Sequence, residues 1–178
     1  MNIQIEKDFT FMTAIHFESK YMVNLYEMNA KMEVCTEDVR EQNIAIERMN
    51  YFLTGQIEDV IFVQNTEKEA IQNYTNAGIK VCIVPEEPYD QIIGMLLVNK
   101  CNAIMEGRIV ITDITFGSKL SNLIKFNIQG EIAKLEYPED SWYNKNTLAL
   151  ADKNKKEKIV TLFDKNNWAE LELTWKQK

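Results

Sequence analysis

The chain has few of the residues that break secondary structure, form cross-links or bind metals. Its 178 residues include six glycines, three prolines, three cysteines and a single histidine, His16. Scarce glycine and proline exclude fibrous and low-complexity linker proteins, while 46% hydrophobic residues is enough to build a core. One histidine without a Cys-x-x-Cys pair makes no recognisable metal-binding set, so we predict no metal and no other cofactor. An odd number of cysteines within apolar segments indicates reduced core residues in a cytoplasmic protein.

Positive charge and long apolar runs are also scarce. The formal net charge is −7, and Arg40, Arg48 and Arg108 are the three arginines. This balance opposes general binding to nucleic acid and suits a partner with a basic surface. The longest apolar run, Ile92 to Val98, is too short to cross a bilayer, and the first residues have no secretory pattern. We therefore expect a soluble cytoplasmic protein that binds neither nucleic acid nor membrane.

The first third of the chain predicts a long β-hairpin. Apolar residues share one parity from Ile3 to Phe17, which is the period of a half-buried strand. A return strand follows a turn at residues 18–20, and its apolar residues begin on odd positions and change to even ones from Met28. Because such a change would flip side chains to the wrong face, we predict a β-bulge near Tyr26 and Glu27.

A helix from Thr36 to Gly55 then leads into the centre of the chain, where strands and helices alternate. The expected elements are a strand at 60–63, a helix at 66–78, a strand at 79–84, a helix from Pro88 to Gly107 and a strand at 109–116. We predict an α/β (α+β) fold with an N-terminal long β-hairpin, a central βαβαβ three-layer-type core and C-terminal antiparallel strands. Residues 1–136 would form the main α/β domain, with residues 137–178 appended to it as a loop and β-hairpin.

The helix at 89–106 is apolar almost all round. Its polar stripe is limited to Gln91, Asn99, Asn102 and Glu106. Such a helix must be covered on nearly every side, either by a sheet and another element or by a second subunit. Homo-oligomerisation through this helix is therefore one of two expectations.

Polar residues gather where the predicted strands end, which is where open α/β sheets usually bind ligands. The candidate binding residues there are Glu86, Glu87, Tyr89, Asp90 and Lys119. Clustered carboxylates are ligands that a divalent cation or a basic side chain would prefer. The same residues also suit the first turn of a helix, where carboxylates meet the positive end of the dipole. Both interpretations remain open from the sequence.

Other residues add weaker hypotheses. Trp142 and Tyr143 lie beside acidic residues and form either an exposed binding edge or a loop packed on the sheet. Asp113 interrupts an alternating strand and is either buried or at the point where the strand emerges into solvent. A Ser-His-Asp arrangement would have to use His16, and neither a nucleophile elbow nor a phosphate-binding loop is present.

Three short blocks carry a resemblance. Residues 40–53, 85–94 and 102–108 are similar to uncharacterised proteins of large tailed bacteriophages, over roughly residues 20 to 130. That family implies no activity and no catalytic residues. Residues 14–17 and 29–34 are also similar to the tetrahydropterin synthase group. The histidine pair of that group is absent at residues 27–31, so its zinc chemistry is not implied.

Two classes of function follow. The first is a non-enzymatic acidic protein, encoded by a phage and located in the host cytoplasm, that binds a protein partner such as a host or defence component or an assembly. The second is a small-molecule, nucleotide or cation binder, or an enzyme, that uses the strand ends around Glu86 to Asp90. We favour the first, because no convergent set of acid, base and nucleophile is recognisable in the sequence.

Overall fold

The computed structural model describes residues 3–122, 124–129 and 141–148, and it has the predicted α+β fold. The strands are β1 (Ile3–Phe17), β2 (Lys20–Val34), β3 (Val60–Gln64), β4 (Lys80–Val84), β5 (Ile109–Ser118) and β6 (Lys125–Gln129). The helices are α1 (Val39–Tyr51), α2 (Lys68–Asn76) and α3 (Asp90–Met105), with a π-helical turn η1 (Phe52–Gln56) and a 3-10 turn η2 (Trp142–Asn144). The predicted C-terminal hairpin, at residues 159–175, lies outside the described residues.

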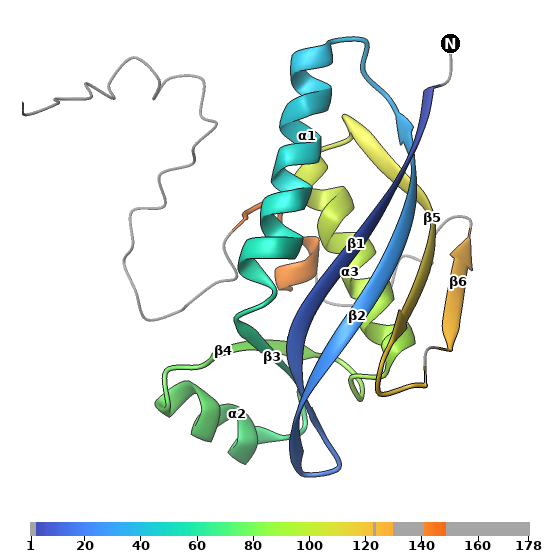
Figure 1. The fold of residues 1–178 in the computed structure, drawn as a ribbon. Helices are drawn as coiled ribbons and strands as arrows, with labels where there is room; N and C mark the ends of the chain where they lie inside the picture. Colours follow the sequence, from blue (N-terminus) through green and yellow to red (C-terminus); the bar gives the residue numbers. More distant parts are fainter. Residues whose placement is uncertain (1–2, 123, 130–140, 149–178) are drawn as a thin grey trace, which may run out of the picture.

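The six strands form one mixed sheet in the order β4-β3-β1-β2-β5-β6. β3 is parallel to β1 and to β4, whereas β2 is antiparallel to both β1 and β5. It follows that β1, β3, β4 and β5 all run in one direction. The predicted βαβαβ order is therefore present along the chain, but in the sheet the N-terminal hairpin lies between its first strand, β3, and its third strand, β5 (Figure 1). The carboxyl ends of all four strands meet at the same edge of the sheet.

The N-terminal hairpin is the longest element, and its register runs unbroken from Ile3 opposite Val34 to Phe17 opposite Lys20. The predicted bulge near Tyr26 is wrong. Even positions of β2 face the core throughout, and Val23 is exposed on the outer face. The register shift lies instead where β2 pairs with β5, between Lys31 and Met32, opposite an extra residue at position 112.

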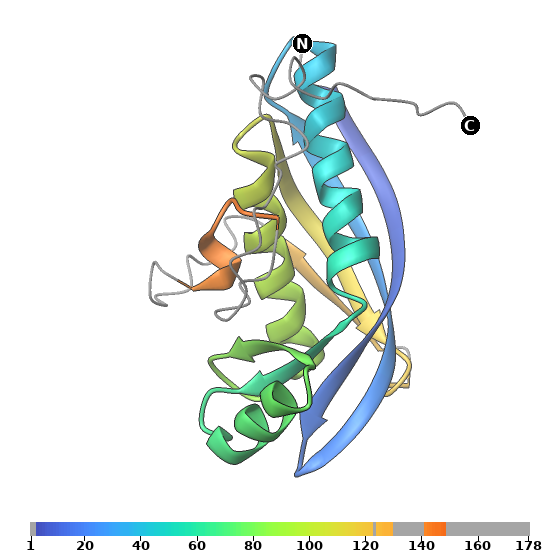
Figure 2. The ribbon, with the colours of Figure 1, turned by 90° about the vertical axis from the view of Figure 1, so that its left-hand side faces the viewer.

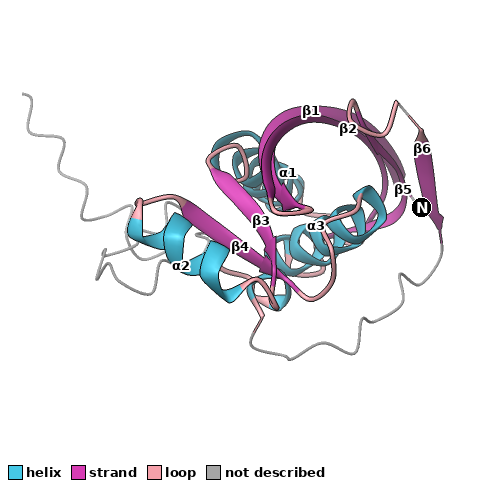
Figure 3. Ribbon diagram, turned by 90° about the horizontal axis from the view of Figure 1, so that it is seen from below, coloured by secondary structure: helices cyan, strands magenta, loops and turns pink. Residues whose placement is uncertain are grey.

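Helices cover the sheet unequally. α1 and α3 pack on its concave face, and Figure 2 shows them side by side in front of the long strands. α2 packs on the opposite face, where Ile71 and Tyr74 cover Ile61 and Val63 of β3. The molecule thus has three layers at the β3 end. Seen from below, the hairpin curves into an arc whose open side faces α3 (Figure 3).

α3 is enclosed by its own chain. Every one of Ile93, Leu96, Leu97, Cys101 and Ile104 is fully buried. The sheet, α1 and η2 supply the cover, so the apolar helix does not require a second subunit. Homo-oligomerisation through residues 89–106 stays a prediction. The cover that this apolar helix needs comes from its own chain, so the need for cover no longer argues for a second subunit.

Local signals placed the helix ends less well than the helix faces. Asp38 rather than Thr36 caps α1, with its carboxylate oxygen accepting the Arg40 amide at 2.8 Å. The chain passes through Gly55 in the π-helical turn, so this glycine does not stop the helix. α2 begins after Glu67 without a side-chain cap, two residues later than the predicted start at residue 66. None of the described helices has the length and apolarity that a bilayer crossing demands.

Candidate functional site

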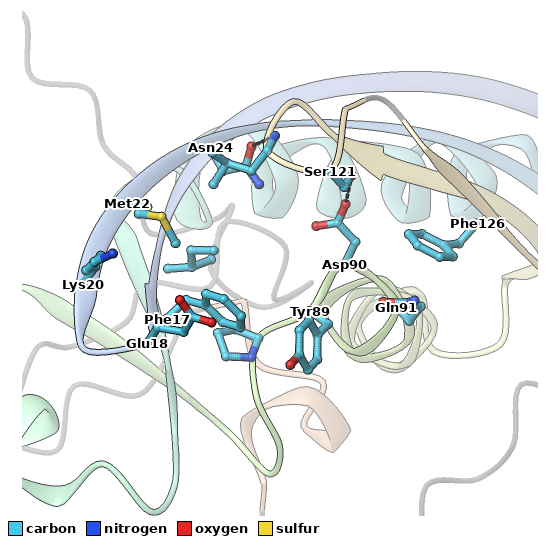
Figure 4. Close-up of a pocket in the computed structure, with 13 residues that line it drawn as sticks. Phe17, Glu18, Lys20, Met22, Asn24, Tyr89, Asp90, Gln91, Ser121 and Phe126 are labelled. Carbon is cyan, nitrogen blue, oxygen red and sulfur yellow. Dashed lines mark hydrogen bonds between the residues drawn. The ribbon is translucent and has the colours of Figure 1, made fainter.

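A pocket of roughly 420 Å³ opens at the sheet edge where the parallel strands end. It lies between the tip of the hairpin, the start of α3 and the turn after β5 (Figure 4). Its lining residues are Ile15, Phe17, Glu18, Lys20, Met22, Asn24, Pro88, Tyr89, Asp90, Gln91, Leu120, Ser121 and Phe126. The pocket therefore lies at the sheet edge where the sequence indicated candidate binding residues.

Asp90 forms the polar floor of this pocket. It is the first residue of α3, and the residue is only 9% exposed. The Ser121 hydroxyl donates to Asp90 Oδ2, with the two oxygens 2.6 Å apart (Figure 4). The Ser118 hydroxyl donates to Asp90 Oδ1, at a distance of 3.0 Å. The two serines and the helix N-terminus together stabilise a buried carboxylate.

Asn24 adds a second polar group to the floor. Its Oδ1 accepts the Leu120 amide at 3.2 Å, and the residue is 3% exposed. Its Nδ2 is buried and has no hydrogen-bond partner among the described residues. A buried donor without an acceptor costs roughly 1–3 kcal/mol, so this amide is incompletely satisfied in the free protein.

The hydroxyl of Tyr26, one inward position further along β2, is in a similar state. It is fully buried, its ring is stacked 5.3 Å from that of Phe116, and it too has no hydrogen-bond partner in the described chain. Burial raises the pKa of Tyr26 well above its ordinary value, and the charge of Asp90 adds to the rise. The nearby Asn24 amide opposes this pKa shift but falls short of a hydrogen bond to the hydroxyl. The phenol therefore stays protonated and remains a donor.

The walls of the pocket are apolar and aromatic. Phe17 and Tyr89 meet edge to face, with ring centroids 5.3 Å apart. Met22 and Phe126 complete the walls, while Tyr89 and Leu120 are half exposed at 53% and 50%. Lys20 and Glu18 sit at the tip of the hairpin, where Glu18 and Ser19 adopt positive φ angles in a two-residue turn. The pocket thus has apolar walls above a polar floor.

The structure separates the predicted site residues. Tyr89 and Asp90 line the pocket, whereas Glu86, Glu87 and Lys119 are not among its lining residues. Glu86 is exposed, and the Lys119 main-chain amide donates to the Leu25 carbonyl at 3.0 Å. Within the described residues, no three histidine, cysteine or acidic side chains are grouped to hold a metal ion. The predicted site residues from Glu86 to Asp90 and Lys119 therefore do not form a single site.

Trp142 and Tyr143 lie away from the pocket and pack within the chain. The Trp142 indole donates to the Ile83 carbonyl at 2.9 Å, and its ring is 6.1 Å from that of Phe62. Tyr143 is only 2% exposed. Of the two alternatives for this loop, the structure shows the packed one.

Sequence reasoning missed Asn24 and Ser121. Asn24 occupies an inward position between Met22 and Tyr26, but it was assigned to the outer face because the odd residues of β2 were taken as inward. A polar residue inside an apolar stripe is the signal that would have found it. Ser121 follows the strand in a turn, and nothing in its local pattern indicates that it reaches back to Asp90.

Comparison with known proteins adds no assignment. The chain matches no protein-family model and no curated protein. The bacteriophage resemblance therefore stays a prediction, and function must be argued from the pocket.

Proposed function

We propose that this protein binds a small organic molecule in the pocket between the hairpin tip and α3. The observation that carries the proposal is the buried Asn24 Nδ2, a donor without a partner beside a buried carboxylate in an apolar pocket. A volume of roughly 420 Å³ is within the usual range for small-molecule sites. Nδ2 has almost no exposed surface in the free protein, so a bound acceptor would reach it only by displacing the groups that cover it, and this contact would relieve the cost of the unsatisfied amide.

The floor also restricts the chemistry of the ligand. Asp90 can accept further hydrogen bonds, because a carboxylate has about four acceptor positions and the two serines occupy two. Asn24 supplies a donor close by. A ligand that fits has an apolar or aromatic body and a polar end with both a donor and an acceptor, such as an amide. A carboxylate or phosphate would meet the charge of Asp90 in a site with little positive charge.

Binding rather than catalysis suits the groups that line the pocket. The lining residues provide hydroxyl, amide and carboxylate groups, with Lys20 at the rim, and they include neither an imidazole nor a thiol. The serines are donors to Asp90, and a carboxylate alone is a weak base for activating a serine hydroxyl. The hydroxyl, amide and carboxylate groups of the pocket are therefore sufficient to bind a ligand.

The test is a binding screen by thermal shift and ligand-observed NMR, with neutral aromatic amides, aromatic carboxylates and aromatic amines as three probe classes. We expect the neutral amides to bind preferentially. Asn24→Leu should remove this binding, because it deletes the Nδ2 donor. It also removes the acceptor of the Leu120 amide, so the melting temperature of the free variant is measured to show that it remains folded. Tyr51→Phe, an exposed position outside the pocket, is the matched control. Binding that survives Asn24→Leu unchanged would contradict the proposal.

Binding of a protein partner is a second candidate, favoured by the exposure of Glu86 and Tyr89, three residues apart in the chain. A partner with a basic surface, from the host of a phage or from an assembly, would contact this corner. Because Asp90 is buried, the informative variant is Glu86→Ala with Tyr89→Ala. We expect it to release a captured partner whose binding weakens with salt. Capture that is equal for both proteins at every salt concentration would argue against this surface.

A further inference from the structure

His16 belongs to a cluster outside the pocket. It lies near the end of β1 on the outer face of the sheet, with a side chain only 10% exposed. Its Nδ1 is 2.9 Å from the hydroxyl of Tyr74, and its Nε2 is 3.9 Å from Oε2 of Glu67. Tyr74 is in α2, and Glu67 is the residue immediately before this helix. The cluster is therefore built by β1 and the start of the α2 segment, at the lower end of the hairpin in Figure 1.

The three groups stand in the order carboxylate, imidazole, hydroxyl. The Tyr74 hydroxyl can donate to Nδ1 only when that nitrogen carries no proton, and this tautomer leaves Nε2–H on the side of Glu67. A base within hydrogen-bond reach of a hydroxyl, itself oriented by a third group, is the arrangement that activates a nucleophile. The sequence had suggested that a triad would have to use His16, and the structure supplies a tyrosine in place of the serine.

We propose that Tyr74, His16 and Glu67 form a nucleophilic site at which the Tyr74 hydroxyl accepts an acyl group from a neutral activated ester. The Tyr74 oxygen attacks the ester carbonyl carbon while its proton passes to His16 Nδ1. The bond from that carbon to the leaving alkoxide or phenoxide then breaks, and the leaving group takes the proton from His16. The products are O-acyl-Tyr74 and a free alcohol or phenol, with no oxidant or reductant needed.

The surroundings of Tyr74 define what the reaction requires. Burial raises the pKa of Tyr74, with a smaller contribution from Tyr21, which opposes loss of the hydroxyl proton, so the reaction depends on His16 as the base. Glu67 is placed to stabilise the imidazolium that forms when His16 takes this proton. Its negative charge also disfavours anionic donors such as phosphate esters. The exposed Tyr21 ring, 6.3 Å from that of Tyr74, offers an aromatic surface for the ester.

The experiment uses the full-length chain with 4-nitrophenyl acetate, and peptide mass spectrometry measures acetylation at each tyrosine over time. Tyr51 is the internal reference, because it is 50% exposed and its hydroxyl is paired with the Gln56 amide at 2.9 Å rather than with an imidazole. We expect Tyr74 to be acetylated at least about tenfold faster than Tyr51. His16→Asn keeps a hydrogen-bond acceptor but removes the base. It should lower the Tyr74 rate at least about tenfold and leave the Tyr51 rate unchanged.

A Tyr74 rate within about twofold of the Tyr51 rate, or one that is unchanged by His16→Asn, would overturn the proposal and leave His16 as a clamp between β1 and α2. Circular dichroism shows whether His16→Asn remains folded. If it does not, Glu67→Gln at a half-exposed position takes its place. A fall of the Tyr74 rate in Glu67→Gln then supports the site, and an unchanged rate overturns it.

Discussion

Lys100 shows how a single side chain is held at some cost in the core. It lies in α3 and is fully buried, yet its ammonium group donates to the main-chain carbonyls of Lys145 and Thr147 at 2.7 and 2.6 Å. It also lies 5.7 Å from the centre of the Phe52 ring. Burial lowers the pKa of Lys100 to about 8, although the nearby thiols act against this shift. The side chain ties residues 145–147 to the helix, and its charge is destabilising there.

The sign of the pH dependence follows from this shift. The pKa of Lys100 in the unfolded chain is near 10.5, so between about pH 8 and pH 10.5 the unfolded state holds more protons than the folded state. The contribution of Lys100 to the free energy of unfolding therefore rises with pH across this window, by at most about 1.4 kcal/mol per pH unit. Urea unfolding of the wild type and of Lys100→Met, from pH 7 to pH 9.5, measures it. The variant keeps both buried thiols, so the difference between the two proteins isolates Lys100. Parallel pH curves would contradict the assigned shift.

At the scale of elements, the spacing of apolar residues along a strand or helix predicted which face is buried. The strict alternation of β1 identified its buried face, and the helical spacing of Ala45, Met49, Phe52 and Leu53 identified the buried face of α1 and the turn after it. The change of parity in the sheet was assigned to β2, but it occurs in β5. There the inward residues switch from Ile109 and Ile111 to Ile114 and Phe116 across the bulge.

The same bulge accounts for Asp113. With one extra residue at position 112, Asp113 turns to the outer face, where the Thr112 hydroxyl donates to its carboxylate at 2.9 Å. Whether a strand carries a bulge depends on the strand with which it pairs, and the sequence of one strand does not identify its pairing partner. Tyr21 and Val23 are apolar but exposed, so the odd positions of β2 were taken as the inward face. Asn24, at an even position, was therefore left out of the candidate site.

The candidate site was predictable in place but only partly in composition. Strand order along the chain indicated the edge, and Tyr89 and Asp90 follow from the start of α3. Phe17 and Met22, near the tip of the curved hairpin, line the pocket at that edge (Figure 4). Curvature is a property of the whole sheet rather than of a local sequence pattern. In the sequence, Glu86 and Asp90 looked like equivalent site residues. Only Asp90 is in the helix, and its carboxylate accepts hydrogen bonds from Ser118 at the end of β5 and from Ser121 in the turn after it.

At the scale of the whole molecule, the layers meet where α3 approaches β5. Gly94 allows this approach. A Cβ atom at position 94 would lie 3.0 Å from Cδ1 and 3.1 Å from Cγ of Phe116. Phe116 is in turn packed against Tyr26 and Phe11, so its ring has little freedom to move aside. The distance between helix and sheet also sets the position of Asp90, one turn earlier in α3, relative to the floor of the pocket.

We therefore expect Gly94→Ala to destabilise the protein by about 1–3 kcal/mol, even though alanine favours a helix by up to about 1 kcal/mol over glycine. Gly55→Ala is the matched control, since its Cβ would meet only the Tyr51 ring at an ordinary 3.6 Å, and it should be neutral or stabilising. Urea unfolding of both variants gives the comparison, and binding of the neutral amide probes gives a second measure. Gly94→Ala should weaken that binding as α3 moves from the sheet, whereas Gly55→Ala should not. Equal stabilities for the two variants would show that the helix and sheet can separate freely, and that the pocket floor does not depend on their contact.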